Sequence, residues 1–568
     1  MSELPVPASI FTAVSVLDSL VRIGMRHVVV SPGSRSAPLV YAVAALEEAG
    51  VVQTYVRTDE RTAGFTALGL AKSLNEPVGI IVTSGTAVGN LMPAVMEADH
   101  QGLPLVVLSA DRPPRLRGTG ANQTTNQVNF FDSHVRATVD LTAYPEESAG
   151  EQTVGFNECL AALTGRDAHV WGNASGTPAG PVQVNCAFDT PLTPNDAAEQ
   201  ILPQWAQSLK EVERPASVIA ADPTVEPWLG SDHLPAEGYR TVVVAGDGAG
   251  AIAAEFAQKL GLPLFAEPSS NALFSANAIC AYREVLSESL GQQIERAVVF
   301  GHPTLSRPIS ALLDNADVEK AIYEPAPVAW YAPGRRSEKP YKYIADLARF
   351  AGSGHGVSAV GSEQSWLNAW VQAGESRRIE HQQNIDRYRE SGENSGRAAA
   401  LALVQDAWNA CREDGASLVV GSSNIIRDLD LGVVSRATSP RVYANRGLAG
   451  IDGTIATAIG ISLAGESGKE RGASKPQKVR LIVGDLTFLH DASSLNIGPL
   501  ETKPDVEIIV LNDHGGGIFG TLEHGKLGKK PVYKNAVQRY FTTPVDVDLE
   551  ALARAYASSG ISVKIVNV

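Results

Sequence analysis

Short apolar runs alternate with longer helical patterns along most of this chain. Near the N-terminus, strand-like runs cover His27 to Ser31, Val78 to Thr83 and Leu105 to Ser109, and a helical pattern, Ala63 to Leu74, lies between them. Alternation of this kind predicts parallel strands that are joined by helices. We therefore expect an α/β protein that is built from doubly wound parallel sheets.

The same alternation recurs twice, which predicts three α/β domains. The predicted divisions are an N-terminal domain over residues 1–190, a Pro-rich and acidic linker over 191–239, a central domain over 240–360, a polar helical connector over 361–397 and a C-terminal domain over 398–568. The chain stops on a strand pattern, Ile561 to Val566. A further covering helix would be expected after it.

Two apolar runs of the C-terminal domain end on side chains that carry oxygen. Leu481 to Val483 precedes Gly484 and Asp485, and Ile508 to Leu511 precedes Asn512-Asp513-His514-Gly515. Ligands gather at the carboxyl ends of parallel strands, and hard oxygen donors there suit Mg²⁺, which binds few protein groups plus substrate phosphates. The pair indicates a diphosphate anchor rather than a P-loop, because no GxxxxGK[ST] run occurs. The alternative is two strands that end in ordinary turns.

Charge and composition exclude several kinds of partner. A net charge of −15 argues against nucleic acid and against an anionic membrane surface, so acidic substrates would need locally gathered arginines. No run approaches 18 apolar residues, and the first residues lack the pattern of a secretory signal, so we expect no membrane span. The four cysteines are far apart and form no CxxC pair, which predicts a reduced cytoplasmic enzyme without a zinc site.

Three loops of the N-terminal domain carry candidate chemistry. Ser31 to Ser36 joins a strand to a helix, where backbone N–H groups can face an anion, although many such turns look alike. Glu60 precedes an Ala-rich helix, a position where a carboxylate is ordinarily a cap. Gly120 to Gln127 is rich in amides, which either bind a ligand or solvate a turn.

Two loops of the C-terminal domain complete the candidate set. Val420 to Asp428 ends a strand with hydroxyl groups and an arginine. Gly447, Gly450 and Gly453 recur at every third position before a helix. Glycines in such a loop let the backbone approach a ligand closely.

The spacing of the two strand ends resembles a known motif. Gly484-Asp485-Leu486, followed by Asn512-Asp513, resembles the GDG…NN motif of thiamine-diphosphate (ThDP) enzymes. The resemblance implies that Asp485, Asp513 and the backbone oxygen of Gly515 hold Mg²⁺, or alternatively Mn²⁺, against the cofactor diphosphate. The chain departs from the motif at Leu486, where Gly is usual, and at Asp513, where Asn is usual. The second departure adds charge at the metal.

Six segments in the same order resemble one branch of that family, the 2-succinyl-5-enolpyruvyl-6-hydroxy-3-cyclohexene-1-carboxylate (SEPHCHC) synthases of menaquinone biosynthesis. They are SPGSRSAPL, RTDERTAGF, GANQTTNQ, NRGLAGIDG, GDLTFLHD and GGGIF. The resemblance implies decarboxylation of 2-oxoglutarate on ThDP and 1,4-addition of the succinyl-semialdehyde unit to isochorismate. It also implies a homo-oligomer, a dimer or tetramer, in which each active site lies at an interface between subunits.

The resemblance assigns roles to residues. Glu60 would face the aminopyrimidine ring nitrogen of the cofactor, and Ile451 would bend the cofactor. Arginine suits the substrates because each carries two carboxylates, which it grips in bidentate fashion. The implied catalytic residues are Glu60, Arg35, Gln123, Arg427 and Arg446; the substrate-binding set adds Ser34, Arg112, Asn122, Arg307, Ser423, Ile518 and Phe519. The cofactor-binding set is Glu60, Ser422, Gly447, Leu448, Gly450, Ile451, Gly484, Asp485 and Leu486. Arg307 follows the family pattern only loosely, and ordinary core packing is the alternative for Ile451, Ile518 and Phe519.

Two rival hypotheses remain. Gly246, Gly248 and Ala251 satisfy a dinucleotide fingerprint, and Glu267 closes the following strand, which would suit an oxidoreductase or a nucleotide-binding protein. That hypothesis leaves the Mg²⁺ pair and the arginines unexplained. Within the ThDP class, another 2-oxoacid decarboxylase or an acetolactate-synthase-like enzyme is the alternative.

Overall fold

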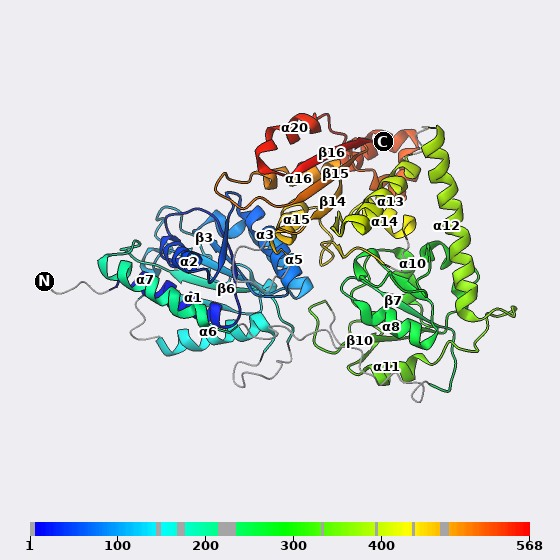
Figure 1. Ribbon diagram of the computed structural model, residues 1–568, viewed down its shortest axis with the longest axis horizontal. Helices are drawn as coiled ribbons and strands as arrows, with labels where there is room; N and C mark the ends of the chain where they lie inside the picture. The colour runs from blue at the N-terminus through cyan, green and yellow to red at the C-terminus, as the bar shows by residue number, and fades with distance from the viewer. Residues whose placement is uncertain are drawn as a thin grey trace.

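The computed structural model describes residues 6–143, 149–166, 177–213, 235–330, 334–391, 396–433, 438–465 and 476–568. Figure 1 shows three α/β units, with the N-terminal unit on the left, the central unit at the lower right and the C-terminal unit at the top. Each unit is built on a sheet whose strands pair in parallel. The predicted fold class is confirmed.

The first sheet has the strand order β2-β1-β3-β4-β6-β5. Its strands are β1 (His27–Val30), β2 (Gln53–Val56), β3 (Val78–Val82), β4 (Leu105–Asp111), β5 (Thr138–Thr142) and β6 (Val182–Ala187). The helices are α1 (Ala8–Arg22), α2 (Ala37–Glu48), α3 (Glu60–Leu74), α4 (Thr86–Gly89), α5 (Met92–Gln101), α6 (Ala149–Thr164) and α7 (Asp196–Ser208). Strands β1, β3, β4 and β6 are buried along their whole length because helices cover both faces of the sheet.

Helix α7 lies inside the segment that we predict as a linker. Its residues Ala198, Leu202 and Ala206 are buried against the core of the first domain. Helix α7 therefore packs as part of the first domain.

The central sheet has the order β11-β10-β9-β7-β8. Its strands are β7 (Thr241–Ala245), β8 (Leu264–Ala266), β9 (Arg296–Phe300), β10 (Glu319–Tyr323) and β11 (Lys339–Tyr341), with helices α8 (Ala251–Leu260), α9 (Tyr282–Val285), α10 (Arg307–Asp314) and α11 (Ile344–Ala351). The long helix α12 (Trp366–Ser391) then runs along the edge of the molecule towards α13 (Arg397–Asp414) (Figure 1). Trp366 and Trp370 anchor its first turns in the central core.

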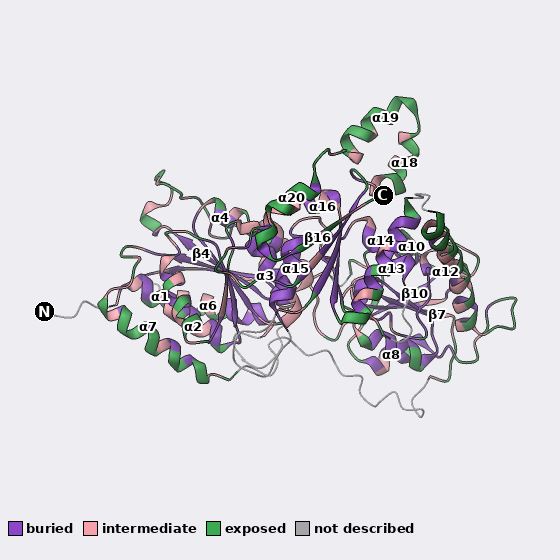
Figure 2. Cartoon of the chain, turned by 45° about the horizontal axis from the view of Figure 1, so that its top comes forward, coloured by how far each residue is buried: buried purple, intermediate pink, exposed green. Residues whose placement is uncertain are grey.

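The C-terminal sheet has the order β13-β12-β14-β15-β16. Its strands are β12 (Ser417–Val420), β13 (Val442–Tyr443), β14 (Val479–Gly484), β15 (Val506–Asn512) and β16 (Ser562–Asn567). The helices are α14 (Asn424–Gly432), α15 (Thr454–Leu463), α16 (Asp485–His490), α17 (Ile518–Thr521), α18 (Glu523–Gly528), α19 (Pro531–Val537) and α20 (Leu549–Ala555). Figure 2 shows that α18 and α19 project from the domain with mostly exposed residues.

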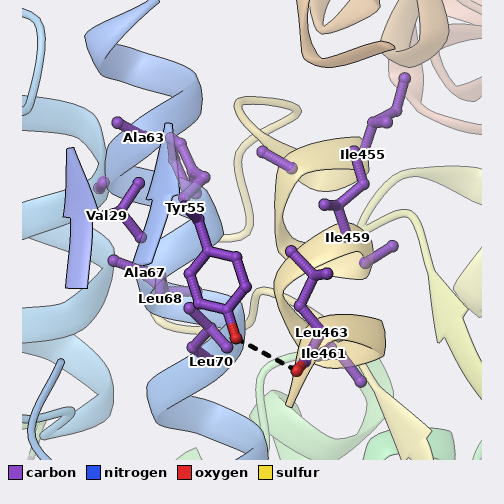
Figure 3. Packing of buried hydrophobic residues seen from close by; sticks show 14 of the residues in the cluster. Val29, Tyr55, Ala63, Ala67, Leu68, Leu70, Ile455, Ile459, Ile461 and Leu463 are labelled. Atoms are coloured by element: carbon purple, nitrogen blue, oxygen red, sulfur yellow. Dashed lines mark hydrogen bonds between the residues drawn. The ribbon is translucent and has the colours of Figure 1, made fainter. Parts of the chain in front are cut away.

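Helices α3 and α15 join the first and last domains in one core. Figure 3 shows apolar side chains of both helices facing each other, and the Tyr55 hydroxyl donates a hydrogen bond of 3.4 Å to the carbonyl oxygen of Leu463. A Cβ on Gly69 would lie 2.2 Å from the Thr457 carbonyl oxygen, and one on Gly460 would lie 2.1 Å from that of Thr66. Only glycines allow the two helices to cross this closely.

Candidate active site

The C-terminal sheet offers a ligand site where its strand order reverses. The chain leaves β12 towards β13 on one side and leaves β14 towards β15 on the other, so the loops after β12 and β14 diverge above the sheet. Ligands of open α/β sheets bind at such a crevice. Ser422 follows β12 and Asp485 follows β14. The first lies among predicted cofactor contacts and the second among predicted metal ligands.

Asp485 is the first residue of α16, and its side chain is 1% exposed. Its Oδ1 accepts a hydrogen bond of 2.8 Å from the backbone N–H of Leu486, whereas Oδ2 is buried without a partner. Burial raises the pKa of Asp485, while the N–H groups of Leu486 and Gly515 act against that rise. These interactions therefore offset the burial of the carboxyl group only in part.

Asp513 lies beside Asp485, in the turn after β15. The Oδ1 of Asn512 accepts a hydrogen bond of 3.3 Å from the N–H of His514, which holds this turn, and His514 has a left-handed φ of 57°. Withdrawal from water and the neighbouring Asp485 carboxylate raise the pKa of Asp513 to about 6. Two converging carboxylates thus repel each other at this edge of the sheet.

These residues fit a hard divalent cation. A cation between Asp485 and Asp513 would satisfy the orphaned Oδ2 and offset the repulsion. No group of three or more His, Cys, Asp or Glu side chains in the described ranges could hold a metal by itself. A magnesium ion here would need further oxygen ligands, such as a backbone carbonyl and a diphosphate, which is how Mg²⁺ usually binds.

The glycine-rich loop between β13 and α15 is held from the first domain. Glu97 of α5, 3% exposed, accepts hydrogen bonds from the N–H groups of Gly447 (2.8 Å) and Leu448 (2.7 Å). Leu448 is 46% exposed and Ile451 is partly exposed, so the loop presents apolar surface. Sequence reasoning missed Glu97. The available signal was a carboxylate between the apolar positions Val95 and Ala98 of the helix Met92–Gln101.

Asp491 is a second buried carboxylate that sequence reasoning missed. Its Oδ2 accepts hydrogen bonds from the N–H groups of Ile455 (2.7 Å) and Ala456 (3.0 Å), in the first turn of α15, and its Oδ1 accepts one from the Ser494 hydroxyl. Burial raises the pKa of Asp491 to about 6. The signal was the last letter of the segment GDLTFLHD. Asp491 fixes the helix that follows the glycine-rich loop.

Glu60 is not the cap of α3. Asp59 is the N-cap, and its Oδ1 accepts hydrogen bonds from the N–H groups of Arg61 (2.9 Å) and Thr62 (3.3 Å). Glu60 is partly buried and accepts a hydrogen bond of 3.2 Å from the Asn90 side chain. The ordinary explanation for a carboxylate at a helix start therefore applies to Asp59 and leaves Glu60 available for another role.

A polar cluster lies at the carboxyl ends of β1, β3 and β4, where the first sheet reverses its order. Arg35 donates to the carbonyl oxygen of Phe188 (2.9 Å), and Arg112 donates to the Ser84 hydroxyl (3.2 Å). Gln123 and Ser84 exchange hydrogen bonds of 3.0 and 2.8 Å. The remaining predicted residues of this domain, Ser34 and Asn122, are exposed near this cluster in sequence.

Arg427 and Arg446 belong to the reversal point of the last sheet. Arg427 donates a hydrogen bond of 2.6 Å to the carbonyl oxygen of Ser423. Arg446, 2% exposed, donates through Nε (3.2 Å) and Nη2 (2.8 Å) to the hydroxyl of Thr304 in the central domain. Its Nη1 lies 3.5 Å from the carbonyl oxygen of Ser422. The central domain thus contacts Arg446 of the last domain directly.

Four of the five predicted arginines make no ion pair with any described residue: Arg35, Arg112, Arg427 and Arg446. Burial and neighbouring arginines lower the pKa of Arg35 and of Arg427. Partly buried cations without a counter-ion favour the binding of an anion. Arg307 differs, because it pairs with Glu523 at 3.0 Å and the two side chains are 71% and 64% exposed.

Ile518 and Phe519 begin α17 and are partly buried. The Phe519 ring packs edge-on against Phe541 at 5.5 Å between centroids, and His524 stacks on Phe541 at 4.1 Å. An aromatic cluster therefore fixes the segment that follows Asp513, rather than the main core of the domain.

The predicted site residues form two separate groups. Within the parts of the chain that the structure describes, no hydrogen bond or ion pair joins Arg35, Arg112 or Glu60 to Arg427, Arg446 or Asp485. The start of α3 instead contacts the end of α16, where Arg61 donates a hydrogen bond of 2.8 Å to the carbonyl oxygen of His490.

The dinucleotide fingerprint does not form an open crevice. Asp247 and His302 exchange backbone hydrogen bonds of 3.0 and 2.9 Å across the ends of β7 and β9. A Cβ on Gly246 would lie 2.1 Å from the backbone nitrogen of Pro303, so the loops are in contact where a pyrophosphate would bind. Glu267 points its carboxylate at backbone N–H groups rather than outward. The dinucleotide hypothesis finds no support in this geometry.

Among the described helices, none has the length and hydropathy that crossing a bilayer requires. All four cysteines, Cys159, Cys186, Cys280 and Cys411, are buried and free of disulfides.

The chain is similar to known families and solved structures. Residues 12–130 match the family described as Thiamine pyrophosphate enzyme, N-terminal TPP binding domain, and residues 430–567 match its C-terminal TPP binding domain. Two solved structures share the fold at 15% identity. They are a thiamine diphosphate-dependent 4-hydroxybenzoylformate decarboxylase from Rhodococcus jostii (TM-score 0.62; 98% of this chain, 99% of that one) and a benzoylformate decarboxylase from Polynucleobacter necessarius (TM-score 0.58; 98% of each chain).

Two curated relatives align over almost the full chain. A 2-succinyl-5-enolpyruvyl-6-hydroxy-3-cyclohexene-1-carboxylate synthase from Renibacterium salmoninarum is 48% identical over 551 residues, which cover 96% of this chain and 89% of the relative. One of the same name from Arthrobacter sp. is 47% identical over 538 residues, which cover 94% and 82%. The chain belongs to the SEPHCHC synthase family of thiamine-diphosphate enzymes.

Proposed function

We propose that this protein is a ThDP- and Mg²⁺-dependent transferase of menaquinone biosynthesis, which decarboxylates 2-oxoglutarate and adds the succinyl-semialdehyde unit to isochorismate. The observation that carries the choice of substrates is a set of four arginines that make no ion pair with a described residue, Arg35, Arg112, Arg427 and Arg446. Two dicarboxylic acids offer four carboxylates, and guanidinium groups bind carboxylates in bidentate fashion. Two monoacids such as pyruvate would offer only two carboxylates and would leave half of these cations unpaired.

Each group of residues has a part in the reaction. When bound, ThDP supplies a carbanion that lets a 2-oxo acid lose CO₂ and its remaining acyl unit act as a nucleophile. Asp485, Asp513 and the carbonyl oxygen of Gly515 would hold the metal that binds the diphosphate. Glu60 would exchange a proton with the aminopyrimidine ring nitrogen. The cofactor would also contact Gly484 and Leu486 at the metal end, Ser422 after β12, and Gly447, Leu448, Gly450 and Ile451 in the glycine-rich loop.

The remaining predicted residues would act on the substrates. Ser34, Asn122, Gln123 and Ser423 offer hydrogen bonds beside the arginines. Ile518 and Phe519 would cover the apolar side of the pocket and exclude water. Arg307 would bind a substrate carboxylate only after its exposed ion pair with Glu523 opens.

The direct test is product identification. The purified protein is incubated with ThDP, Mg²⁺, 2-oxoglutarate and isochorismate, and the product is identified by mass. We expect SEPHCHC, with one CO₂ released for each isochorismate consumed. Release of free succinic semialdehyde without any adduct would contradict the transferase and favour a simple decarboxylase.

We also propose that two subunits complete each site, in a cytoplasmic homo-oligomer. The support is that no hydrogen bond or ion pair joins Arg35 or Glu60 to Asp485 within the described parts of one chain. A C₂ pair would let the N-terminal domain of one subunit face the C-terminal domain of its partner. The four cysteines form no disulfide, which fits a reducing compartment.

Complementation tests the shared site. Inactive Glu60→Gln and Asp485→Ala proteins are mixed under conditions of subunit exchange, which places a wild-type Glu60 opposite a wild-type Asp485 in one of two sites. We expect some activity to return. No recovery despite proven exchange would argue for a site within one chain.

A further inference from the structure

The acidic residue of the closed dinucleotide fingerprint has a different task in this chain. Glu267 follows β8 and is 1% exposed. Its Oε1 accepts hydrogen bonds from the N–H groups of Thr304 (3.0 Å) and Leu305 (2.8 Å). Both residues belong to the loop between β9 and α10, so the Glu267 carboxyl group fixes that loop through hydrogen bonds to its backbone.

The loop that Glu267 holds presents one hydroxyl group to the last domain. The Oγ1 of Thr304 accepts hydrogen bonds from Nε (3.2 Å) and Nη2 (2.8 Å) of Arg446. Nη1 of the same guanidinium lies 3.5 Å from the Ser422 carbonyl oxygen. These contacts use Nε and one N–H on each terminal nitrogen. A second N–H on each terminal nitrogen remains, which is the arrangement that a bidentate contact to a carboxylate needs.

The charge balance supports an anion as the missing partner. Arg446 makes no ion pair with a described residue, and it is almost fully buried. Burial raises the pKa of Glu267 to about 8, so near neutral pH this carboxyl is largely uncharged and does not neutralise Arg446. Because the groups that orient Arg446 are uncharged, the buried guanidinium still attracts an anionic ligand.

We propose that Thr304 and Glu267 are positioning residues, which hold the Arg446 guanidinium in the orientation that binds a carboxylate of one diacid substrate. The inference rests on the proposed function, because it takes Arg446 to be a substrate-binding residue. It assigns the central domain a part in substrate recognition, through the strand ends that in other α/β domains bind a nucleotide.

The size of the effect follows from geometry. Without the Thr304 hydroxyl, the arginine loses the acceptor for two of its N–H groups and is free to turn. Misplacement of a binding group by about 1 Å can cost about 10²-fold. We expect Thr304→Val to raise the KM for one diacid by about tenfold to a hundredfold, with ThDP affinity within about twofold of wild type.

Matched variants separate positioning from general damage. Thr304→Ser keeps the hydroxyl and should behave nearly as wild type, whereas Thr304→Val keeps the shape and loses the acceptor. In an Arg446→Ala background, Thr304→Val should have no further effect, because both changes remove one interaction. Glu267→Gln keeps an oxygen acceptor and should be milder than Glu267→Ala. Unchanged KM values in Thr304→Val, or an equal loss in the Arg446→Ala background, would overturn the proposal.

A second readout does not depend on turnover. Crystal structures of the wild type, Thr304→Ser and Thr304→Val should place the Arg446 guanidinium identically in the first two and elsewhere in the third. If the wild type consumes no 2-oxoglutarate, the proposed function fails, and the crystal structures alone decide on positioning. An Arg446 that stays in place in Thr304→Val overturns the proposal in either case.

Discussion

Glu97, on a helix of the first domain, accepts a hydrogen bond of 2.8 Å from the backbone N–H of Gly447, in the glycine-rich loop of the last domain. The same carboxylate holds the next N–H, that of Leu448. The loop would contact the cofactor in the proposed site, so its shape depends on a residue of another domain. The packing of α5 against this loop within one chain would thus support the proposed cofactor site.

Replacing Glu97 tests that dependence. Glu97→Ala leaves two backbone N–H groups without their acceptor, and hydrogen bonds to a charged group contribute about 1.5–3 kcal/mol each. We expect ThDP affinity, measured by calorimetry with Mg²⁺ present, to fall about tenfold or more. Glu97→Gln retains one acceptor oxygen and serves as the control. Wild-type affinity in Glu97→Ala would show that the loop keeps its shape unaided.

Removal of Asp485 should weaken ThDP binding without lowering the stability of the metal-free protein. Asp485→Ala should abolish Mg²⁺-dependent ThDP retention, because it removes the buried metal ligand. In the presence of a chelator, the same variant should melt no lower than wild type, since it also removes a buried carboxylate whose Oδ2 has no partner. The exposed Asp317→Ala should change neither quantity. Retention of ThDP at wild-type affinity would refute the metal assignment.

Neighbouring carboxylates at the start of α3 should behave differently. Glu60→Gln should still bind ThDP, while exchange of the cofactor thiazolium C2 proton, followed by NMR, slows by roughly 10²–10⁴. Asp59→Ala removes the N-cap and should cost about 0.5–2 kcal/mol of stability with a much smaller effect on exchange. The assignment of Glu60 fails if the two variants change places.

Asp491 predicts a pH dependence of stability. The native carboxyl keeps its proton up to about pH 6, whereas the ordinary pKa is 3.8. Between these pH values the native state binds more protons than the unfolded state. The contribution of Asp491 to the free energy of unfolding therefore falls as pH rises through this window. Asp491→Asn lacks this titration. We would subtract the denaturation midpoint of Asp491→Asn from that of the wild type. This difference should fall as pH rises from about 4 to 6 and then level off. A difference that does not change with pH would contradict the raised pKa of Asp491.

The fold could be predicted because helices cover both faces of each sheet. Strands such as β3 and β15 then become almost continuous apolar runs that are bounded by turns. Asp485 and Asp513 could be proposed as metal ligands for the same reason, since they follow adjacent strands, and that role stays a prediction. Helix α7 was less visible. It contains Pro203 in its interior, which ordinarily breaks a helix, and its segment is acidic, so it looks like a linker.

The missed residues depend on contacts between distant parts of the chain. Glu97 and Gly447 are 350 positions apart, and no local pattern relates them. Glu267 was noticed only as part of a dinucleotide fingerprint, because sequence shows that an acid ends a strand but not where its carboxylate points. Arg307 fitted the arginine pattern by type, and only the structure shows its exposed partner Glu523.

The choice of substrate is the central claim, and one ratio tests it most directly. We would measure kcat/KM of the wild type for 2-oxoglutarate and for pyruvate, with ThDP, Mg²⁺ and saturating isochorismate. Arginines that pair with no described carboxylate, such as Arg427 and Arg446, should favour the diacid. One extra charge-assisted contact corresponds to about tenfold to over a hundredfold in kcat/KM. The account predicts a ratio well above one that collapses when the responsible arginine is replaced by alanine. A wild type that prefers pyruvate, with both Arg427→Ala and Arg446→Ala unaffected, would contradict it.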